Sequence, residues 1–220
     1  MESYLDSRSP ASFTGPQKLY KHLNKKFTLK EIKNWLSQQD SYTLHKPVRR
    51  RFRRRRTFTI GINDLWQIDL ACLESVSKYN DGVKFLLICI DVFSKVLRVA
   101  PLKNKSAKSV TAAFERMLEF QQPIYVQSDK GTEFLNSTFQ ELLRNRGIKF
   151  YVSQNDDVKC AIAERVQRTL KEKLFRLMTY KNTKRYIDDL EALVESYNNT
   201  FHRSIKRTPN EVSPTDRKST

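Results

Sequence analysis

The sequence predicts an α/β fold, in which a mixed five-stranded sheet is flanked by helices and preceded by a small helical N-terminal segment. Three observations lead to this prediction. After residue 60, apolar spacing typical of strands and helices follows the order strand, strand, strand, helix, strand, helix, strand, helix, helix. The Asp81-Gly82 turn and hairpin spacing make the first three strands an antiparallel meander. Helix-capping residues before residue 40 predict the N-terminal helices.

The N-terminal segment, residues 1–45, is expected to contain two short helices. Pro16 suits the first turn of a helix over residues 16–25. Thr28-x-x-Glu31 is a capping box that opens the second helix. Apolar residues continue that helix at helical spacing: Leu29, Ile32, Trp35 and Leu36. The pair resembles a helix-turn-helix that reads DNA, or a helical hairpin that packs on the main domain, and the sequence leaves both open.

A basic linker is predicted over residues 46–60. Residues 46–56 include eight basic side chains in eleven positions, so this run is expected to be extended and solvated. It is a candidate phosphate clamp or nuclear import signal, with a merely solubilising linker as the alternative. The candidate DNA contacts within it are Arg49, Arg50, Arg51, Arg53, Arg54, Arg55 and Arg56.

Composition excludes several classes of protein. The 41 Lys and Arg residues exceed the 24 Asp and Glu residues, and the net charge of +17 indicates a polyanionic partner. The longest apolar run, residues 85–90, is too short to cross a membrane, so no membrane partner is expected. The five glycines are too dispersed for a dinucleotide or Walker phosphate loop. The three cysteines form no CxxC pair, which argues against a thiolate zinc site.

The main domain is predicted over residues 61–215, with residues 216–220 as a tail. Its first strand, residues 65–72, alternates apolar Trp66 and Ile68 with polar Gln67 and Asp69. The second strand is almost continuously apolar, as expected for a strand buried on both faces. The later strands are expected at 85–93, 96–100, 124–127 and 148–152, and the helices at 106–120, 137–147, from about 161, and 183–199.

Three carboxylates occupy positions that are unusual for acids. Asp69 lies inside a strand, Asp129 directly follows one, and Glu164 is in the first turn of a helix, away from its apolar stripe. Carboxylates that face one another repel, and hard divalent cations between them offset this repulsion. Two such ions, about 3.5–4 Å apart, can clamp a phosphodiester. The alternative is that each acid has a local structural role. The competing acids are Asp91, Glu133, Asp156 and Asp157.

Two cations accompany Glu164 on its helix. Arg168 and Lys171 follow it at i+4 and i+7, on the face of the carboxylate. They are candidates to hold DNA phosphates beside the acids. The alternative is a solvated charged face with a Glu164–Arg168 ion pair.

Three segments together resemble the signatures of retroviral-type integrase cores. They are Trp66-Gln-Ile-Asp69-Leu, Ser128-Asp129-Lys-Gly-Thr-Glu-Phe134 and Glu164-Arg-Val-Gln-Arg-Thr-Leu-Lys171. Two further segments are similar to that family: Ile-Asp91-Val-Phe-Ser-Lys and Ser-Tyr197-Asn-x-x-x-His202-Arg-Ser-Ile. The likeness covers roughly residues 17–215 and is strongest to the integrases of Polinton (Maverick) DNA transposons.

The resemblance implies a ribonuclease-H-like fold and a metal-dependent polynucleotidyl transferase that frees DNA 3′ ends and joins them to target DNA. It implies that Asp69, Asp129 and Glu164 are catalytic and bind two Mg²⁺ or Mn²⁺ ions. Residues 153–159 would lie over the site, with Lys159 as a DNA contact. The implied partners are element ends, target DNA and further copies of the chain, and the implied location is the nucleus.

The sequence departs from that family at two points near the acids. Asp129 and Glu164 have 34 residues between them, one fewer than is usual in retroviruses, and Gln167 stands where many relatives carry Asn. Two other functions therefore stay open: a DNA-binding relic without activity, and a nuclease that cuts without joining.

Overall fold

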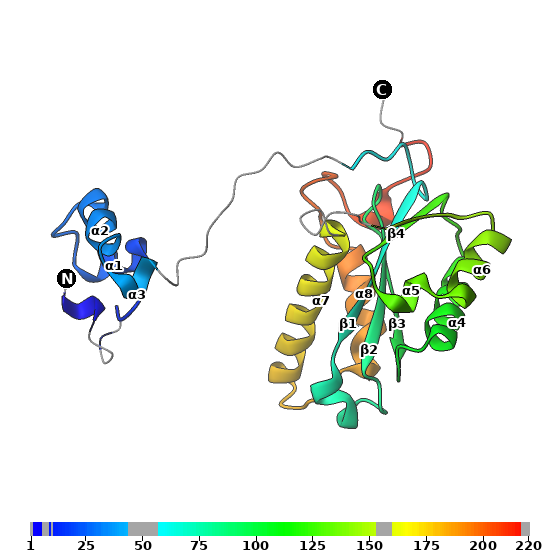
Figure 1. Ribbon diagram of the computed structural model, residues 1–220, viewed down its shortest axis with the longest axis horizontal. Helices are drawn as coiled ribbons and strands as arrows, with labels where there is room; N and C mark the ends of the chain where they lie inside the picture. Colours follow the sequence, from blue (N-terminus) through cyan, green and yellow to red (C-terminus); the bar gives the residue numbers. More distant parts are fainter. Residues whose placement is uncertain (1, 6–8, 10, 44–56, 153–159, 217–220) are drawn as a thin grey trace. The chain divides into compact units, whose positions relative to one another are not determined.

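The computed structural model describes residues 2–5, 9, 11–43, 57–152 and 160–216 (Figure 1). The chain divides into two compact units, residues 1–53 and residues 54–220. Each unit is described by itself. The predicted basic run at residues 46–56 and the predicted loop at residues 153–159 lie outside the described residues. The same holds for the candidate DNA contacts Arg49 to Arg51, Arg53 to Arg56 and Lys159.

The N-terminal unit contains the two expected helices and two short additional ones. These elements are η1 (Glu2–Tyr4), α1 (Pro16–His22), α2 (Leu29–Leu36) and α3 (Asp40–Thr43). The capping box is confirmed, because the Thr28 N–H donates to the Glu31 carboxylate at 2.7 Å and the Glu31 N–H donates to the Thr28 hydroxyl at 3.2 Å. The small core of this unit consists of Tyr4, Ala11, Leu19, Ile32 and Leu36.

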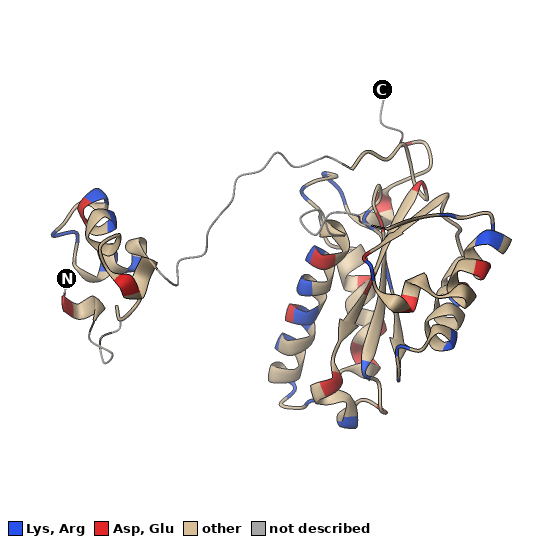
Figure 2. Cartoon of the chain, in the orientation of Figure 1, with Lys and Arg blue, Asp and Glu red and all other residues tan. Residues whose placement is uncertain are grey.

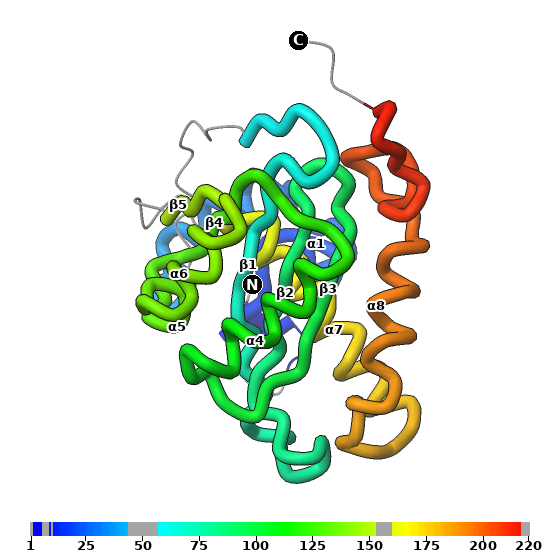
Figure 3. Tube along the Cα trace, turned by 90° about the vertical axis from the view of Figure 1, so that its right-hand side faces the viewer, coloured from blue at the N-terminus to red at the C-terminus, as the bar shows by residue number. Residues whose placement is uncertain are grey.

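The second unit is built on a mixed five-stranded sheet with the strand order β3-β2-β1-β4-β5 (Figure 3). The strands are β1 (Leu65–Cys72), β2 (Phe85–Asp91), β3 (Leu97–Leu102), β4 (Tyr125–Ser128) and β5 (Lys149–Val152). The first three pair antiparallel, whereas β4 pairs parallel to β1 and β5 pairs parallel to β4. The predicted meander and mixed sheet are therefore confirmed.

Helices cover both faces of the sheet (Figure 1). One face carries α4 (Ala107–Leu118), α5 (Thr132–Leu135) and α6 (Ser137–Asn145), and the other carries α7 (Ala161–Tyr180) and α8 (Leu190–Asn198). Short 3₁₀ helices are η2 (Glu74–Tyr79), η3 (Ile187–Asp189) and η4 (Pro209–Glu211). Within the described part of the chain, no helix has the length and apolar character needed to span a membrane.

The strand β2 explains why the unit has two hydrophobic layers. Leu86, Ile88 and Ile90 belong to the cluster beneath α7 and α8. Leu87 and Cys89 point the other way, into the cluster beneath α4, α5 and α6. Because successive side chains of a strand alternate between faces, the continuous apolar run serves both layers.

The last helix begins later than the sequence predicts. A single helix is expected over residues 183–199, but residues 187–189 form η3 and α8 begins at Leu190. The buried side chain of Asn80 accepts the N–H groups of Tyr186 and Ile187 at 2.7 and 3.1 Å and donates to the carbonyl of Lys184 at 2.9 Å. These bonds hold the connection after α7 in a non-helical path, and the sequence pattern gives no sign of them.

Candidate active site

The pairing of β1 with β4 places two of the predicted acids next to each other. In this parallel pair, Gln67 lies opposite Gln127. Side chains alternate along a strand, so Asp69 is on the same face as Gln67. Asp129 comes two residues after Gln127, just beyond the end of β4. The two aspartates therefore follow the paired residues Gln67 and Gln127 by two positions on adjacent chain segments, and the charge of Asp129 acts on Asp69.

The first turn of α7 brings Glu164 to the same place. The side-chain oxygen Oε1 of Gln67 accepts the backbone N–H groups of Ile162 and Ala163, each at 3.1 Å. One turn further on, the Gln167 amide donates to the carbonyl of Leu70 at 3.0 Å. Glu164 lies between these two attachments, so α7 holds it against the segment of β1 that carries Asp69.

The three acids are close enough for the charges of Asp129 and Glu164 to act on Asp69. The pKa of Asp69 is raised to about 6, mainly by burial and also by the nearby charges of Asp129 and Glu164. The Leu70 N–H, which donates to Asp69 at 2.8 Å, and the Lys171 ammonium act in the opposite direction. The pKa of the Cys160 thiol is raised to about 12 by burial and by the same three carboxylates.

Gly131 allows the turn after β4 to fold tightly around Asp129. The Asp129 carboxylate accepts the Gly131 N–H at 3.1 Å. A Cβ atom at position 131 would lie 3.0 Å from Oδ1 of Asp129 and 2.9 Å from Cδ of Glu133. A larger residue would therefore displace one of these carboxylates. Glu133 lies close to the site, as the sequence suggests for a neighbouring acid.

The carboxylate oxygens of the three acids are the type of ligand that a hard divalent cation prefers, but they are too far apart to bind one ion together. Among the described residues, no three His, Cys, Asp or Glu side chains form a group that could hold a metal ion as they stand. Three carboxylates that repel one another across a half-buried site nevertheless match the oxygen ligands that Mg²⁺ prefers. Binding an ion would require these side chains to approach one another.

Asp91 has a structural role, unlike the three acids. It is 1% exposed, and its carboxylate accepts N–H groups from Asn63, Phe93 and Ser94 at 2.6, 2.7 and 2.8 Å. It thereby fixes the turn between β2 and β3. Asp156 and Asp157, the other competing acids in the sequence, lie outside the described residues.

The two predicted cations of α7 differ in their surroundings. Arg168 is exposed, whereas Lys171 is half-buried and acts on the charge of Asp69. No ion pair joins Glu164 to Arg168, both of which the structure describes, so the proposed neutralising pair is not formed. Figure 2 shows basic and acidic residues interspersed along α7.

Sequence reasoning missed Gln67 and Gln127, which join the elements of the site. The Gln67 amide donates to Oε1 of Gln127 at 3.0 Å, and Gln67 is 2% exposed. The alternation of β1 marks Gln67 only as a polar residue on the side opposite Trp66. Its position two residues before Asp69 could have indicated a role, because it places both side chains on the same face of β1, which α7 covers.

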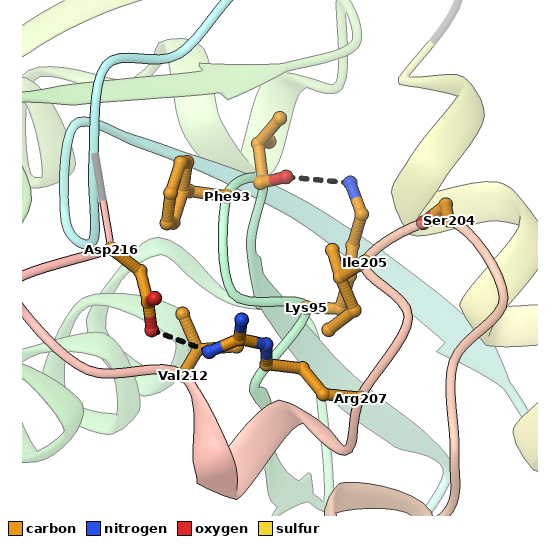
Figure 4. Close-up of a pocket in the computed structure, with 8 residues that line it drawn as sticks. Phe93, Lys95, Ser204, Ile205, Arg207, Val212 and Asp216 are labelled. Atoms are coloured by element: carbon orange, nitrogen blue, oxygen red, sulfur yellow. Dashed lines mark hydrogen bonds and ion pairs between the residues drawn. The ribbon is translucent and has the colours of Figure 1, made fainter. Parts of the chain in front are cut away.

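A separate pocket of about 400 Å³ contains none of the three acids (Figure 4). It lies between the turn after β2 and the C-terminal segment, with Phe93, Ile205 and Val212 among its lining residues. Its polar side includes the Arg207–Asp216 ion pair, at 2.8 Å. The pocket is thus distinct from the site on β1, β4 and α7.

Known proteins are similar to the part of the chain that carries Asp69 and Asp129. Residues 61–157 match the family model of the integrase core domain (rve). The matched segment includes Asp69 and Asp129 and ends before Glu164. A transposon-derived protein of Caenorhabditis elegans is 40% identical over 141 residues, which are 63% of this chain. The chain spans about half (49%) of that relative's length.

Solved structures of integrases share the fold of this unit. A chain of the simian T-cell lymphotropic virus intasome, in complex with PP2A regulatory subunit B56 gamma, matches with a TM-score of 0.68 and 16% identity. That match covers 92% of this chain and 76% of the viral chain. The HTLV-2 integrase catalytic core domain in complex with magnesium (trimeric form) matches with a TM-score of 0.57 and 19% identity, covering 68% and 95%. The sheet and its flanking helices therefore have the ribonuclease-H-like fold of integrase catalytic cores.

Proposed function

We propose that this chain is a transposon-derived integrase, a metal-dependent polynucleotidyl transferase that processes DNA 3′ ends and joins them to target DNA. The observation that carries the proposal is that the charges of Asp129 and Glu164 both act on Asp69. Two of these three acids lie in the segment that matches the integrase core domain. Similarity to a transposon-derived protein of Caenorhabditis elegans supports the origin. The finer likeness to Polinton integrases rests on the signature segments of the sequence.

In this proposal Asp69, Asp129 and Glu164 would hold two Mg²⁺ or Mn²⁺ ions. The ions would supply the Lewis acidity and charge neutralisation that phosphodiester chemistry requires. The magnesium in the structure of the HTLV-2 core is consistent with this cofactor. The repulsion that raises the pKa of Asp69 would be relieved when the site is occupied.

The chain's own cations would hold the DNA. Exposed Arg168 is placed to bind phosphate on the helix that carries Glu164, and Lys171 lies close enough to act on Asp69. Lys159 and the basic run at residues 46–56 would extend this surface along the DNA backbone. The helices within residues 1–45 would form a DNA-binding arm ahead of the catalytic core at residues 61–215.

We further propose that the protein acts as a homo-oligomer in the nucleus. Structures of the HTLV-2 core in trimeric and dimeric forms support self-association. The basic run supports nuclear import, because such runs are typical import signals.

A second function, DNA binding without catalysis, is favoured by one observation. The acids of the described residues do not form a group arranged to hold an ion. If they cannot approach one another, the core is a scaffold and the basic residues alone act. A nuclease that cuts without joining is the third possibility.

The test is a strand-transfer assay on the full chain, with labelled element-end DNA and Mg²⁺ or Mn²⁺. The variants are Glu164→Gln and Asp129→Asn. The matched control is Glu172→Gln, which alters an exposed acid two turns further along α7 that pairs with Arg176 at 3.9 Å. We expect joined products from the wild-type protein and the control, and none from either variant, with DNA affinity preserved in all.

The other outcomes separate the alternatives. Cut products without joined products would identify a nuclease. DNA binding without any metal-dependent product from the wild-type protein would identify a binding relic. Joined products from Glu164→Gln would overturn the assignment of the three acids.

A further inference from the structure

A single buried side chain connects the three elements that carry the acids. Gln67 lies on β1, two residues before Asp69. Its Nε2 donates to Oε1 of Gln127, which lies on β4 two residues before Asp129. Its Oε1 accepts two N–H groups from the first turn of α7, the turn that contains Glu164. Each element is therefore attached to Gln67 within two residues of its acid.

The attachment to α7 replaces a missing helix cap. The first N–H groups of a helix have no partner within the helix, and the side chain of the residue before the helix usually accepts one of them. In α7 that residue is Cys160, whose side chain makes no capping bond. Gln67 supplies the acceptor from a strand 95 residues earlier in the chain. The position of the first turn of α7 is thus set by β1.

Burial makes this arrangement specific. Gln67 is 2% exposed, so its amide cannot exchange these partners for bulk water. The Gln67 carbonyl oxygen accepts two N–H groups of α7, and its amide donates to Gln127 on β4. Together these bonds fix both the distance and the rotation of α7 relative to β1 and β4. A side chain of another length could not satisfy all three partners at once.

We infer that Gln67 is a positioning residue for the three acids and sets the separation of Glu164 from Asp69 and Asp129. The inference rests on the proposed function, in which these acids would hold the metal ions that act on the phosphodiester. Gln67 acts through the backbone of α7 and the side chain of Gln127, and it needs no contact with DNA. Its removal would leave the phosphate-binding cations of α7 in place while loosening the acids.

Asn80 provides a matched control, because it makes the same kind of connection elsewhere. It is fully buried, accepts the N–H groups of Tyr186 and Ile187, and joins segments about one hundred residues apart. It lies at the end of α7 opposite Glu164, since its partners follow Tyr180. Asn80→Ala therefore removes a buried bridging amide without affecting the attachments of the acids.

The experiment compares Gln67→Ala, Gln67→Glu and Asn80→Ala in the full chain. Turnover in strand transfer, the apparent KM for DNA, the Mn²⁺ concentration for half-maximal rate and the thermal midpoint are measured for each. For Gln67→Ala we expect turnover to fall about 100-fold, as is typical of a misplacement of about 1 Å. We expect KM for DNA to stay within about twofold and the half-maximal Mn²⁺ concentration to rise. Asn80→Ala should lower the thermal midpoint at least as much while turnover per folded molecule is preserved.

Gln67→Glu keeps a side-chain oxygen that can accept the N–H groups of Ile162 and Ala163. We expect this variant to fold even if Gln67→Ala does not. Gln127 can rotate its amide to donate to the new carboxylate, so turnover should exceed that of Gln67→Ala. Wild-type turnover in both Gln67 variants would overturn the inference. Equal losses of turnover in Asn80→Ala and Gln67→Ala would also overturn it, because the effect would then follow from stability alone. If the wild-type protein shows no strand transfer, the proposed function is contradicted. The positioning role is then tested by the thermal midpoint measured at increasing Mn²⁺ concentrations. A weaker rise of the midpoint with Mn²⁺ in the Gln67 variants than in the wild type supports that role, and an equal rise contradicts it.

Discussion

The side-chain amide of Gln167 donates a hydrogen bond of 3.0 Å to the backbone carbonyl of Leu70, the residue next to Asp69. Gln167 follows Glu164 by three residues, which is almost one turn of α7. The bond therefore connects the helix that carries one acid directly to the strand that carries another. Together with Gln67, it attaches the first two turns of α7 to β1 at two levels.

Replacement of Gln167 by Met should destabilise the core unit by about 1 kcal/mol, because the Leu70 carbonyl loses its side-chain partner. Urea unfolding of the full chain measures this change. Thr169→Ala is the control, since the Thr169 hydroxyl bonds only within its own helix, to the carbonyl of Arg165. A Gln167→Met protein as stable as the wild type would show that the bond contributes nothing.

Asp69→Asn should stabilise the metal-free protein at pH 7 by about 1 kcal/mol, because it removes a half-buried charge that two other carboxylates oppose. The pKa of Asp69 is raised to about 6 in the folded state, above its ordinary value of about 4 in the unfolded chain. The folded state therefore binds more protons between these values, and wild-type stability falls as the pH rises from about 4 to 6.

The advantage of the Asn variant should accordingly be complete above about pH 6 and disappear near pH 4. Chemical unfolding in EDTA across this range measures the difference. The same substitution should abolish strand transfer. A variant that is less stable than the wild type at pH 7 would contradict the electrostatic description of the site.

Asp91→Asn should have the opposite pattern to Asp129→Asn. The variant amide cannot accept all three N–H groups that the buried Asp91 carboxylate accepts, so we expect a loss of about 2–3 kcal/mol in unfolding free energy. Strand transfer per folded molecule should be preserved. Asp129→Asn, at an exposed position, should keep the stability and lose the activity. Thermal unfolding and strand transfer on both variants distinguish structural from catalytic acids.

Arg185 should stabilise the fold at neutral pH and lose this effect in acid. Its guanidinium bonds Asp81 at 2.8 Å and Asp188 at 2.7 Å, and it lowers the pKa of both carboxyl groups. A lowered pKa stabilises the folded state above the unfolded value of about 4, and this contribution is lost as the pH falls through the lower folded values.

Arg185→Gln should therefore lower the unfolding midpoint at pH 7, and the difference from the wild type should vanish towards pH 2. Salt should reduce the difference, because the groups are exposed. Arg176→Gln, which removes a 3.9 Å pair on an exposed face of α7, should have no measurable effect. An equal effect of both substitutions would show that the Arg185 cluster has no special role.

Local patterns in the sequence predict most of the sheet. The first strand, residues 65–72, is confirmed at both ends because its alternation reflects two different layers, one apolar and one covered by α7. Helical spacing predicts an apolar stripe on α7 that consists of Ala163, Val166, Leu170, Leu174 and Leu177. The first four are buried, but Met178 and not Leu177 completes the buried face. The 3.6-residue period locates such a stripe to within one position at the end of a helix.

Features that depend on distant partners could not be predicted in this way. Asn80 interrupts the expected helix at residues 183–199 from more than one hundred residues away. Nothing in the sequence around Gln67 and Gln127 marks them as partners. Only the strand register shows that they lie opposite each other. The three acids could be selected because Asp and Glu are unusual at those positions, whereas the attachments that hold them require the tertiary structure.

The cap of α7 by Gln67 also affects the order of folding. Closing a segment of about one hundred residues carries an entropic penalty, and contacts of such long range tend to form slowly. The start of α7 cannot be fixed until β1, β4 and the helix have all been synthesised and joined. A nascent chain that has released only residues 61–157 contains two of the acids but neither the third nor the capped helix. The three acids would thus come together only after α7 has been synthesised and attached to β1.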